Sequence, residues 1–206
     1  MTAKNQDHLI HQSLSNGDEY DDLLHRPLLN ATQQIAQGLP VSPTLRIQIL
    51  NDVMAVWQNP PFWQMSETIN EIFSGITDSD FANEVSARLL QCPCIESARI
   101  AGQLGKKEEA ATVLLELSRK EVQDVGDEDE IVAAAIALGE ICEKQEAALR
   151  LLEIANHSQY EDFARTYAIE AIVDLGKQSP QILSALLELA RDVKADAVVR
   201  VSAAHS

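Results

Sequence analysis

The feature of this sequence that most constrains its fold is a leucine-rich run that occurs three times. The run reads LLEL, LLEI and LLEL, and it occupies residues 114–117, 151–154 and 186–189. A period of about 20–50 residues is typical of repeat proteins, because one unit cannot bury its apolar face alone and must stack on the next. The recurrence therefore predicts that this part of the chain is built from stacked units.

Each leucine-rich run follows a turn, and a segment of small residues precedes the turn. The small residues are in matching register at 97–98, 134–135 and 168–169, and the turns contain Gly105, Cys142 and Gly176. Small side chains let neighbouring helices approach closely, and leucines fill the space between layers. One unit is therefore predicted to be an alanine-rich helix, a tight turn and a leucine-rich helix, with Leu152 between the repeat layers.

The whole chain shows helical rather than strand periodicity. Alanine and leucine dominate the apolar residues, aromatic residues make up only 4%, and the period-two alternation of strands is absent. We predict an all-α fold: an α-solenoid (superhelix) of antiparallel helix pairs with a less regular helical N-terminal half. The repeat units are expected at about residues 95–120, 128–157 and 160–192, with a partial unit at 195–206.

The N-terminal half has helical spacing without a clear repeat. We expect a flexible N-terminus at residues 1–17 and an irregular helical region at residues 18–94, which degenerate repeats would also fit. Pro27 is expected to disturb the first helix of this region. Ser42, which precedes a proline, and one of Asp78, Ser79 and Asp80 carry the kind of side chain that caps helix N-termini. They are predicted to begin two further helices.

One repeat unit contains the pattern Ala135-x-x-Leu138-Gly139-x-Ile141, followed by Glu146-Ala147 and the run at 151–154. This pattern resembles HEAT-type repeats, in particular the short bacterial HEAT-like repeats of the phycobilin lyase type. The resemblance covers about residues 95–206, and it departs from the family pattern at Cys142, where a turn glycine is usual, and at Lys144, where many repeats carry proline. Because such repeats mostly serve in scaffolding and protein recognition, the resemblance implies architecture more strongly than activity.

The charge of the chain limits the partners that it can take. With 16 Lys and Arg against 32 Asp and Glu, the net charge is −16, and both halves are acidic. Such a surface repels nucleic-acid phosphates and anionic lipids, so we expect a protein partner of basic or mixed charge and no nucleic acid. No apolar window is long enough for membrane insertion. Three cysteines without a signal peptide indicate a reducing, cytoplasmic location.

No pattern in the sequence assigns a reaction. The H-E-x-x-H and C-x-x-C patterns of metal sites, the G-x-S-x-G nucleophile pattern and glycine-rich phosphate loops are all missing. Cys92 and Cys94 flank a proline and could bind a soft metal through their thiolates, but a turn between helices is the favoured interpretation. We therefore assign no catalytic residue, no metal and no cofactor, and we favour a non-enzymatic role.

A row of charged side chains on the leucine-rich helices is the candidate binding surface. It is predicted to lie opposite the leucine stripe, on the face that lines the concave groove of HEAT-like solenoids. Glu116, Glu153 and Glu188 would form an acidic ladder along the stacked helices, suited to a basic ligand, and an ordinary solvated helix face is the other interpretation of this row. The candidate residues on these helices are Glu109, Glu116, Arg119, Glu146, Glu153, Glu188 and Arg191. Trp57 and Trp63 are a second candidate anchor, and core packing is the other interpretation of their aromatic stretch.

These observations favour one function and leave two alternatives open. The favoured function is a protein–protein interaction scaffold that binds its partner through the concave face. The first alternative is a phycobilin lyase-like or chaperone-like factor that acts on bilin-carrying (phycobilisome) proteins, as the resemblance permits. The second is a regulatory or truncated part of a larger helical-repeat protein, suggested by the end of the chain within a repeat-like helix at 203–206. Self-association through the exposed face of the C-terminal repeat is a further expectation.

Overall fold

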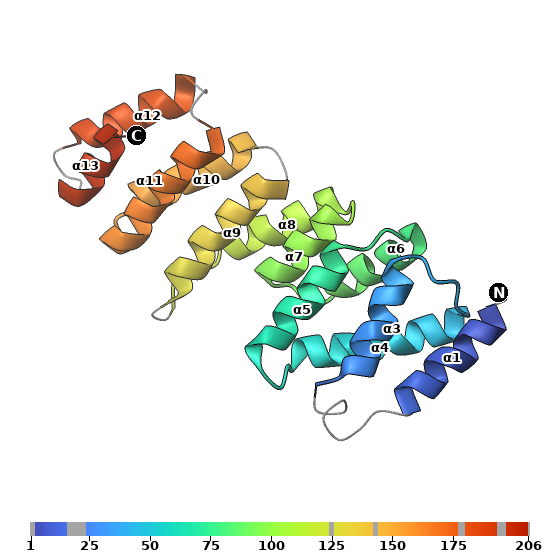
Figure 1. Ribbon diagram of the computed structural model, residues 1–206. Coiled ribbons are helices and arrows are strands. Elements are labelled where there is room, and N and C mark those ends of the chain that lie inside the picture. The colour runs from blue at the N-terminus through green and yellow to red at the C-terminus, as the bar shows by residue number, and fades with distance from the viewer. Residues whose placement is uncertain are drawn as a thin grey trace. The chain divides into compact units, whose positions relative to one another are not determined.

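The computed structural model of the 206-residue chain describes residues 3–15, 24–123, 126–141, 144–176, 180–192 and 197–205. These residues form twelve helices and no strand (Figure 1), so the predicted all-α class is confirmed. The chain divides into two compact units, Met1–Arg88 and Leu89–Ser206. The predicted domain boundary, after residue 94, lies slightly later than this division.

The described residues of the first unit form five helices. They are α1 (Ala3–Ser15), α3 (Arg26–Ala36), α4 (Pro43–Gln58), α5 (Trp63–Ser74) and α6 (Ser79–Leu89), whose last residue falls at the boundary. Helices α3, α4 and α5 each contact the other two. Their buried apolar side chains include Ile35, Ile49, Ile69 and Phe73. Burial of these side chains holds the three helices together, because removing apolar surface from water is the main stabilising effect in folding.

Polar side chains cap two of these helices, as the sequence predicts. The Ser42 hydroxyl oxygen accepts a hydrogen bond from the backbone N–H of Leu45 (3.3 Å) at the start of α4. Oδ1 of Asp78 accepts one from the N–H of Phe81 (2.7 Å) at the start of α6. Both bonds satisfy N–H groups that have no partner within their own helix. Contrary to the prediction, Pro27 does not disturb a helix but lies in the first turn of α3, where its missing N–H is not needed.

Helix α1 occupies a segment for which the sequence predicts a flexible terminus. Ile10 is buried on α1, and this helix contacts α3. Oδ1 of Asp7 accepts a hydrogen bond from the backbone N–H of Ser42 at 2.9 Å, which joins α1 to the start of α4. Hydrogen bonds from the side chain and the backbone N–H of Ser42 lower the pKa of the Asp7 carboxyl below its usual value. Residues 3–15 thus form a largely polar helix that tertiary contacts hold against its neighbours, and residues 16 and 17 of the predicted flexible segment lie outside the described part.

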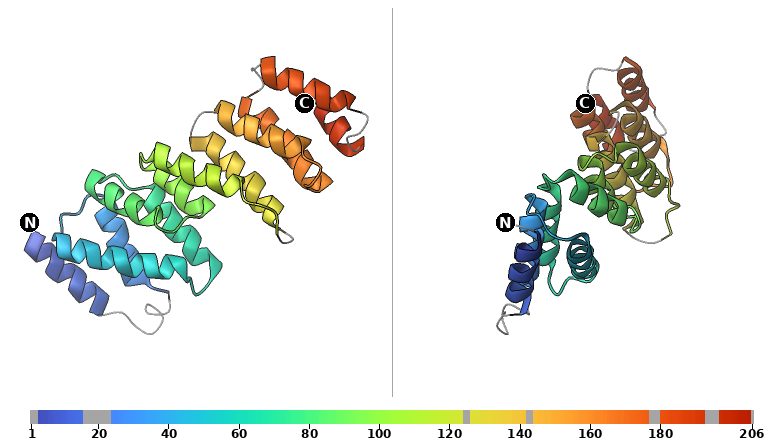
Figure 2. Two further views of the ribbon diagram at one scale, coloured as in Figure 1. Left: turned by 180° about the vertical axis from the view of Figure 1, so that it is seen from behind. Right: turned by 90° about the vertical axis from the view of Figure 1, so that its right-hand side faces the viewer.

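The second unit consists of helix pairs packed in two layers (Figures 1 and 2). Its helices are α7 (Ile95–Gln103), α8 (Lys107–Ser118), α9 (Asp127–Ile141), α10 (Lys144–Asn156), α11 (Asp162–Gly176), α12 (Pro180–Arg191) and α13 (Ala197–His205). In the first layer, α7, α9, α11 and α13 each contact the next helix of the series. In the second layer, α8, α10 and α12 each pack against the first-layer helix that follows. The turn residue Cys142 lies outside the described residues.

A single apolar cluster runs through the second unit. First-layer helices contribute fully buried small residues, among them Ala98, Ala134, Ala135 and Ala168. Second-layer helices contribute Leu114, Leu151 and Leu186. Leu152, which is predicted to lie between the layers, is half-buried, whereas the preceding Leu151 is fully buried. The inward face of α10 is therefore centred one residue before the predicted position.

Two glycines mark close approaches between first-layer helices. A Cβ atom at Gly139 would lie 2.5 Å from Cδ2 of Leu175 on α11 and 3.1 Å from Cβ of Ala147 on α10. At the equivalent Gly102, it would lie 3.0 Å from Cδ1 of Ile141 on α9. The 2.5 Å distance at Gly139 is shorter than a normal carbon–carbon contact, and the 3.0 Å distance at Gly102 is at its limit. A side chain at either position would therefore push neighbouring helices apart.

Two arginines connect successive helix pairs. Nε of Arg150 on α10 donates a hydrogen bond to the backbone oxygen of Ser118, the last residue of α8, at 3.0 Å. Nε of Arg165 on α11 donates one to the backbone oxygen of Ala155, near the end of α10, also at 3.0 Å. Ser118 and Ala155 occupy the same position in their units. Each arginine thus satisfies a carbonyl group without an intrahelical partner and places a cation at the negative end of a helix dipole.

Candidate functional site

The acidic ladder residues are exposed on successive second-layer helices. Glu116 on α8, Glu153 on α10 and Glu188 on α12 all lie at the surface. The other candidate residues on these helices are exposed as well: Glu109, Arg119, Glu146 and Arg191. Helices α10 and α12 contact each other, whereas the main neighbours of α8 are α7 and α9. Glu153 and Glu188 therefore lie on adjacent helices, and Glu116 is less closely associated with them.

This second-layer surface has mixed chemistry rather than uniform negative charge. Nη1 of Arg150 forms an ion pair with Oε2 of Glu153 at 2.9 Å, which offsets the charge at the centre of the ladder. Arg119 at the end of α8 and Arg191 at the end of α12 add positive charge. Leu149 is 43% exposed and lies four residues before Glu153, hence on the same side of α10. The surface is amphipathic, with an apolar side chain among charges of both signs.

The two candidate tryptophans have different environments. Trp57 on α4 is half-buried, and its Nε1 donates a hydrogen bond to Oδ1 of Asn70 on α5 at 2.7 Å. This bond and the contact between α4 and α5 make Trp57 part of the packing of the first unit. Trp63, the first residue of α5, is 65% exposed. Of the two rings, Trp63 is the more accessible to a partner.

A groove in the second unit combines an exposed aromatic pair with carboxylates. It has a volume of about 470 Å³ and lies at the first turns of α9 and α11. Its described lining includes Glu128, Asp129, Glu161 and Phe163, and contains no Lys or Arg. Phe163 is 71% exposed, and its ring stacks on that of Tyr167 with centroids 6.4 Å apart and 21° between the planes.

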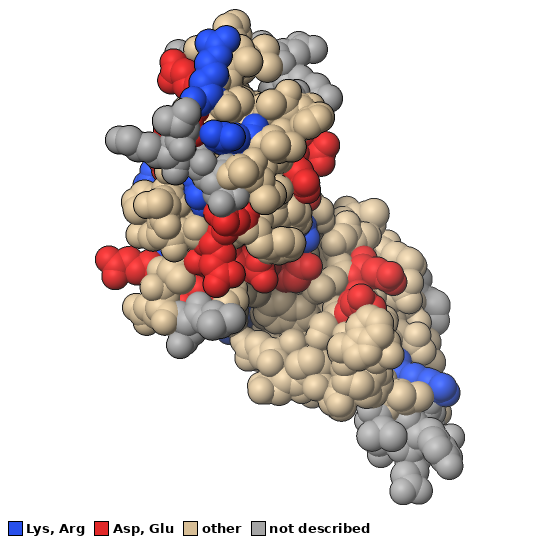
Figure 3. All heavy atoms as spheres, turned by 90° about the vertical axis from the view of Figure 1, so that its left-hand side faces the viewer, with Lys and Arg blue, Asp and Glu red and all other residues tan. Residues whose placement is uncertain are grey.

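Backbone and side-chain contacts hold this groove together. Oε2 of Glu128 in the first turn of α9 accepts a hydrogen bond from the backbone N–H of Glu161, just before α11, at 2.8 Å. Ala164 and Ala168 on the inner side of α11 are buried, which directs the neighbouring Phe163 away from the core. On the face that Figure 3 displays, acidic side chains gather across the middle. The groove therefore offers an aromatic surface in a negative environment, which favours a cation.

Phe163 and Tyr167 are not among the binding residues that were predicted from the sequence. A signal was nevertheless present, because Phe163 is equivalent in the repeat to Asp129, and both line the groove. A position that carries a charge in one unit must tolerate water, so an aromatic residue at the same position in the next unit is expected to be exposed. The spacing of four between Phe163 and Tyr167 places both rings on one side of the helix.

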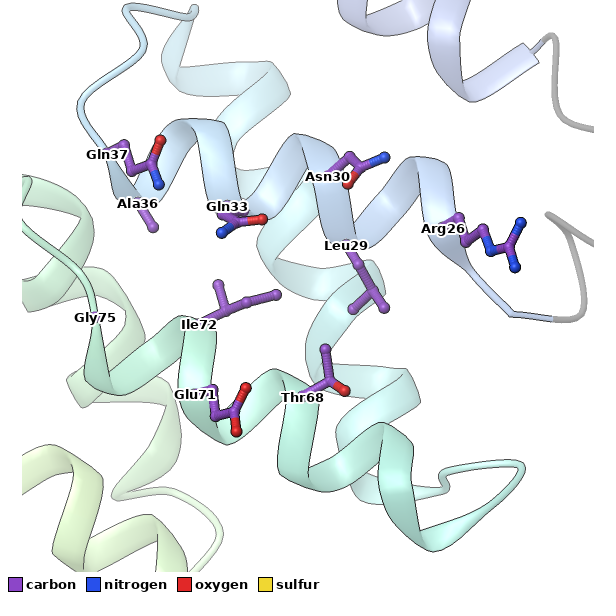
Figure 4. Close-up of a pocket in the computed structure, with 10 residues that line it drawn as sticks. All are labelled: Arg26, Leu29, Asn30, Gln33, Ala36, Gln37, Thr68, Glu71, Ile72 and Gly75. Carbon is purple, nitrogen blue, oxygen red and sulfur yellow. The ribbon is translucent and has the colours of Figure 1, made fainter.

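The first unit has a groove between α3 and α5 (Figure 4). It has a volume of about 420 Å³, and Leu29, Thr68 and Ile72 point toward one another across it. Arg26 and Glu71 are the charged residues of its described lining, and the other polar groups are mostly amides. Two carboxylates in different environments, as acid–base catalysis by a carboxylate pair requires, are not found among these residues.

Cys92 and Cys94 take part in the start of α7. Sγ of Cys94 accepts a hydrogen bond from the N–H of Ser97 at 3.4 Å, and the Ser97 hydroxyl donates one to the backbone oxygen of Cys92 at 2.7 Å. The backbone N–H of Cys94 donates in turn to Oγ of Ser97, which completes a reciprocal cap. In the described part of the chain, no group of three or more His, Cys, Asp or Glu is placed to hold a metal ion.

None of the helices that the structure describes is both long and apolar enough to cross a bilayer. No protein-family model matches the chain, and comparisons with curated proteins and with solved structures find no significant match. The chemistry of the surfaces described above is therefore the basis on which a function can be assigned.

Proposed function

We propose that this chain is an α-solenoid of HEAT-like repeats that acts in the cytoplasm as a scaffold and binds a basic segment of a partner protein. The stacking of α7, α9, α11 and α13, each on the next, supports the solenoid. One observation carries the binding role: the exposed Phe163–Tyr167 pair beside a carboxylate-lined groove. The net charge of −16 supports a basic rather than an acidic partner.

The aromatic pair has the properties of a binding anchor. Burial of a phenylalanine side chain is worth about 1.5–3 kcal/mol relative to exposure, and a partner that covers Phe163 would recover most of this. Rigid aromatic side chains in a polar surround are typical of the residues that dominate binding energy. Asp129 and Glu161 lie in the same groove and can pair with a Lys or Arg, whose cation can also lie over the ring. The groove fits a segment in which basic and apolar side chains alternate.

The second-layer surface is the other candidate for the same function. In HEAT-like solenoids the second helices line the concave face, and here Leu149 lies near Glu153, with Glu188 on the adjacent helix. This combination fits an amphipathic basic helix. Because Arg150 already pairs with Glu153, a cation of the partner would contribute less binding energy at this surface than in the groove. We therefore place the main contact at Phe163 and Tyr167.

Binding of a designed peptide tests the proposal. The probe is a fluorescent amphipathic peptide of Arg, Leu and Ala, and the control probe has Glu in place of every Arg. We expect the Arg peptide alone to bind, with an affinity that falls as NaCl rises from about 50 to 300 mM. Changing Phe163→Ala together with Tyr167→Ala should weaken binding about tenfold or more. Equal binding of the two peptides, or an unchanged affinity of the double variant, would contradict the proposal.

Two further variants locate the surface. Trp63→Ala is the matched control, because it removes an aromatic residue that is also exposed, but from the other unit, and it should leave the affinity unchanged. Changing Glu116, Glu153 and Glu188 together to Gln should reduce the affinity less than the aromatic double variant does. A larger loss in this triple variant would move the main contact to the second-layer surface.

The two alternative functions stay predictions. A lyase-like or chaperone-like factor would have to accept a bilin, whose propionate groups are negative at neutral pH. Glu128, Asp129 and Glu161 would repel these groups in the second-unit groove. Absorbance after mixing the protein with a free bilin tests this alternative directly. A role as part of a larger helical-repeat protein is tested by the mass and size of the native protein.

A further inference from the structure

The aromatic pair on α11 has a geometry that limits the shape of the cation it can bind. The rings of Phe163 and Tyr167 are inclined by only 21°, with their centroids 6.4 Å apart. A bulky, roughly spherical cation such as a methylated ammonium group is bound best when aromatic rings enclose it on several sides, as in an aromatic cage. Two nearly parallel faces do not enclose a ligand in this way, but a planar group can lie flat against either of them. The pair therefore favours a flat cation.

The groove beside the Phe163 ring has an apolar wall. Val122 is half-buried against the core cluster, Ala164 is buried, and both residues line the groove. The aliphatic stem of a long basic side chain can lie on such a surface while its charged end stays in a polar environment. The ring itself is 71% exposed, so it is open to the charged end of that side chain.

Two exposed carboxylates lie in the same groove. Asp129 is in the first turn of α9, and Glu161 directly precedes α11. The hydrogen bond from the backbone N–H of Glu161 to Oε2 of Glu128 keeps these two segments together. The described lining contains no Lys or Arg, and Arg165 on α11 donates to the backbone oxygen of Ala155 in the interior. A cation of the described lining therefore does not neutralise this pair of carboxylates.

We propose that the groove is selective for arginine: the guanidinium of an arginine in the partner lies flat on the Phe163 ring and donates hydrogen bonds to Asp129 and Glu161. This inference rests on the proposed function, because it identifies the basic residue that the groove binds. A guanidinium is planar and has five N–H donors around its edge. When its face covers an aromatic ring, these donors stay in the guanidinium plane, directed toward carboxylates beside the ring.

Lysine fits this combination of groups less well. Its ammonium is compact and more strongly hydrated than a guanidinium, so covering it with a ring costs more hydration energy. An N–H that points at the ring is also lost to the carboxylates, whereas a stacked guanidinium keeps all its donors for them. Trimethyl-lysine has no N–H and would leave Asp129 and Glu161 without hydrogen bonds. General attraction by the acidic chain acts equally on Lys and Arg, so selectivity between them reports on the groove itself.

Peptides that differ only in their basic residue test this inference on the full chain. The reference is the fluorescent peptide of Arg, Leu and Ala, and the other probes carry Lys, trimethyl-lysine or citrulline in place of every Arg. Citrulline keeps the flat shape of the side chain but has no charge. We expect the Arg peptide to bind at least about fivefold more tightly than each of the others.

The outcomes separate this inference from the function on which it rests. Equal affinities of the Arg and Lys peptides, or tighter binding of the trimethyl-lysine peptide, would overturn the arginine selectivity. A citrulline peptide that binds as tightly as the Arg peptide would overturn the role of the carboxylates. If both the Arg and the Lys peptides bind and the Glu peptide does not, the proposed function survives and only the selectivity is lost.

Variants of the groove locate the selectivity. Phe163→Leu keeps an apolar side chain but removes the ring, so the ratio of Arg-peptide to Lys-peptide affinity should fall toward one. Asp129→Asn combined with Glu161→Gln should lower the affinity for both peptides and reduce this ratio. The matched control is Glu170→Gln, which removes an exposed carboxylate of α11 that does not line the groove and should leave the ratio unchanged. Circular dichroism verifies that each variant keeps its helices. An unchanged ratio in Phe163→Leu would rule out stacking on the ring.

Discussion

Replacing Leu151 with alanine should destabilise the second unit far more than replacing Leu149, only two residues away. Leu151 is 0% exposed within the apolar cluster of the unit. The change removes three buried carbon atoms at about 0.8 kcal/mol each, and the cavity that remains raises the expected loss to about 2–5 kcal/mol. Leu149 is 43% exposed, so its truncation should cost less than about 1 kcal/mol. Leu152 is half-buried, so the loss of stability in Leu152→Ala should lie between these two values.

The arrangement of the tryptophans allows the loss to be assigned to one unit. Trp57 and Trp63 both lie in the first unit, so tryptophan fluorescence during urea unfolding reports on that unit, whereas far-ultraviolet circular dichroism reports on both. Leu151→Ala should lower the urea midpoint of the circular dichroism transition and leave the fluorescence transition nearly unchanged. Equal losses for Leu151→Ala and Leu149→Ala, or a loss below about 1 kcal/mol at Leu151, would refute the assignment of the inward face.

Three further perturbations test local features of the fold. Asp78→Ala should destabilise the first unit by about 1 kcal/mol, because the N–H of Phe81 loses its cap, and thermal unfolding measures this loss. Gly139→Val should cost about 1–3 kcal/mol in urea unfolding, since its side chain would overlap Leu175; a stabilised variant would show that the helices are not in close contact. The pKa of Asp7, measured by NMR titration, should lie below its ordinary value and rise in Ser42→Ala. Because this folded-state pKa is lowered, the stabilisation from Asp7 is fully present above the ordinary value near 4 and is lost as the pH falls through the lowered pKa.

The elements that could be predicted from the sequence are those whose signal is local. Ser42 and Asp78 begin helices because their side chains satisfy N–H groups within the same few residues. The repeat of Ala and Leu likewise specifies helices, since apolar spacing determines which side each helix buries. The one-residue difference between Leu151 and Leu152 shows the limit of this reasoning. Adjacent leucines share the apolar stripe, and only the packing of neighbouring helices decides which one is fully covered.

The features that escaped prediction depend on contacts between distant segments. Helix α1 contains few apolar residues, and its order rests on the burial of Ile10 and the bond from Ser42 to Asp7, 35 residues away in sequence. The exposure of Phe163 and Tyr167 is also a tertiary property, because aromatic residues at helical spacing are normally expected in a core. The partial neutralisation of Glu153 by Arg150 could have been suspected, since the two are three residues apart on one helix.

The half-buried Arg150 and the buried Arg165 have a consequence for how the units align. An interface made only of alanine and leucine tolerates sliding, because one methyl group can replace another at little cost. Arg150 and Arg165 do not permit this, since each guanidinium reaches a single carbonyl at the end of the preceding second-layer helix. Displacing one unit along its neighbour would break these two hydrogen bonds and leave the carbonyl groups at the helix ends without their partners, and a hydrogen bond to a charged group is worth about 1.5–3 kcal/mol. The two side chains therefore contribute mainly to the specificity of stacking. They select one alignment of the units from several that hydrophobic packing alone would allow.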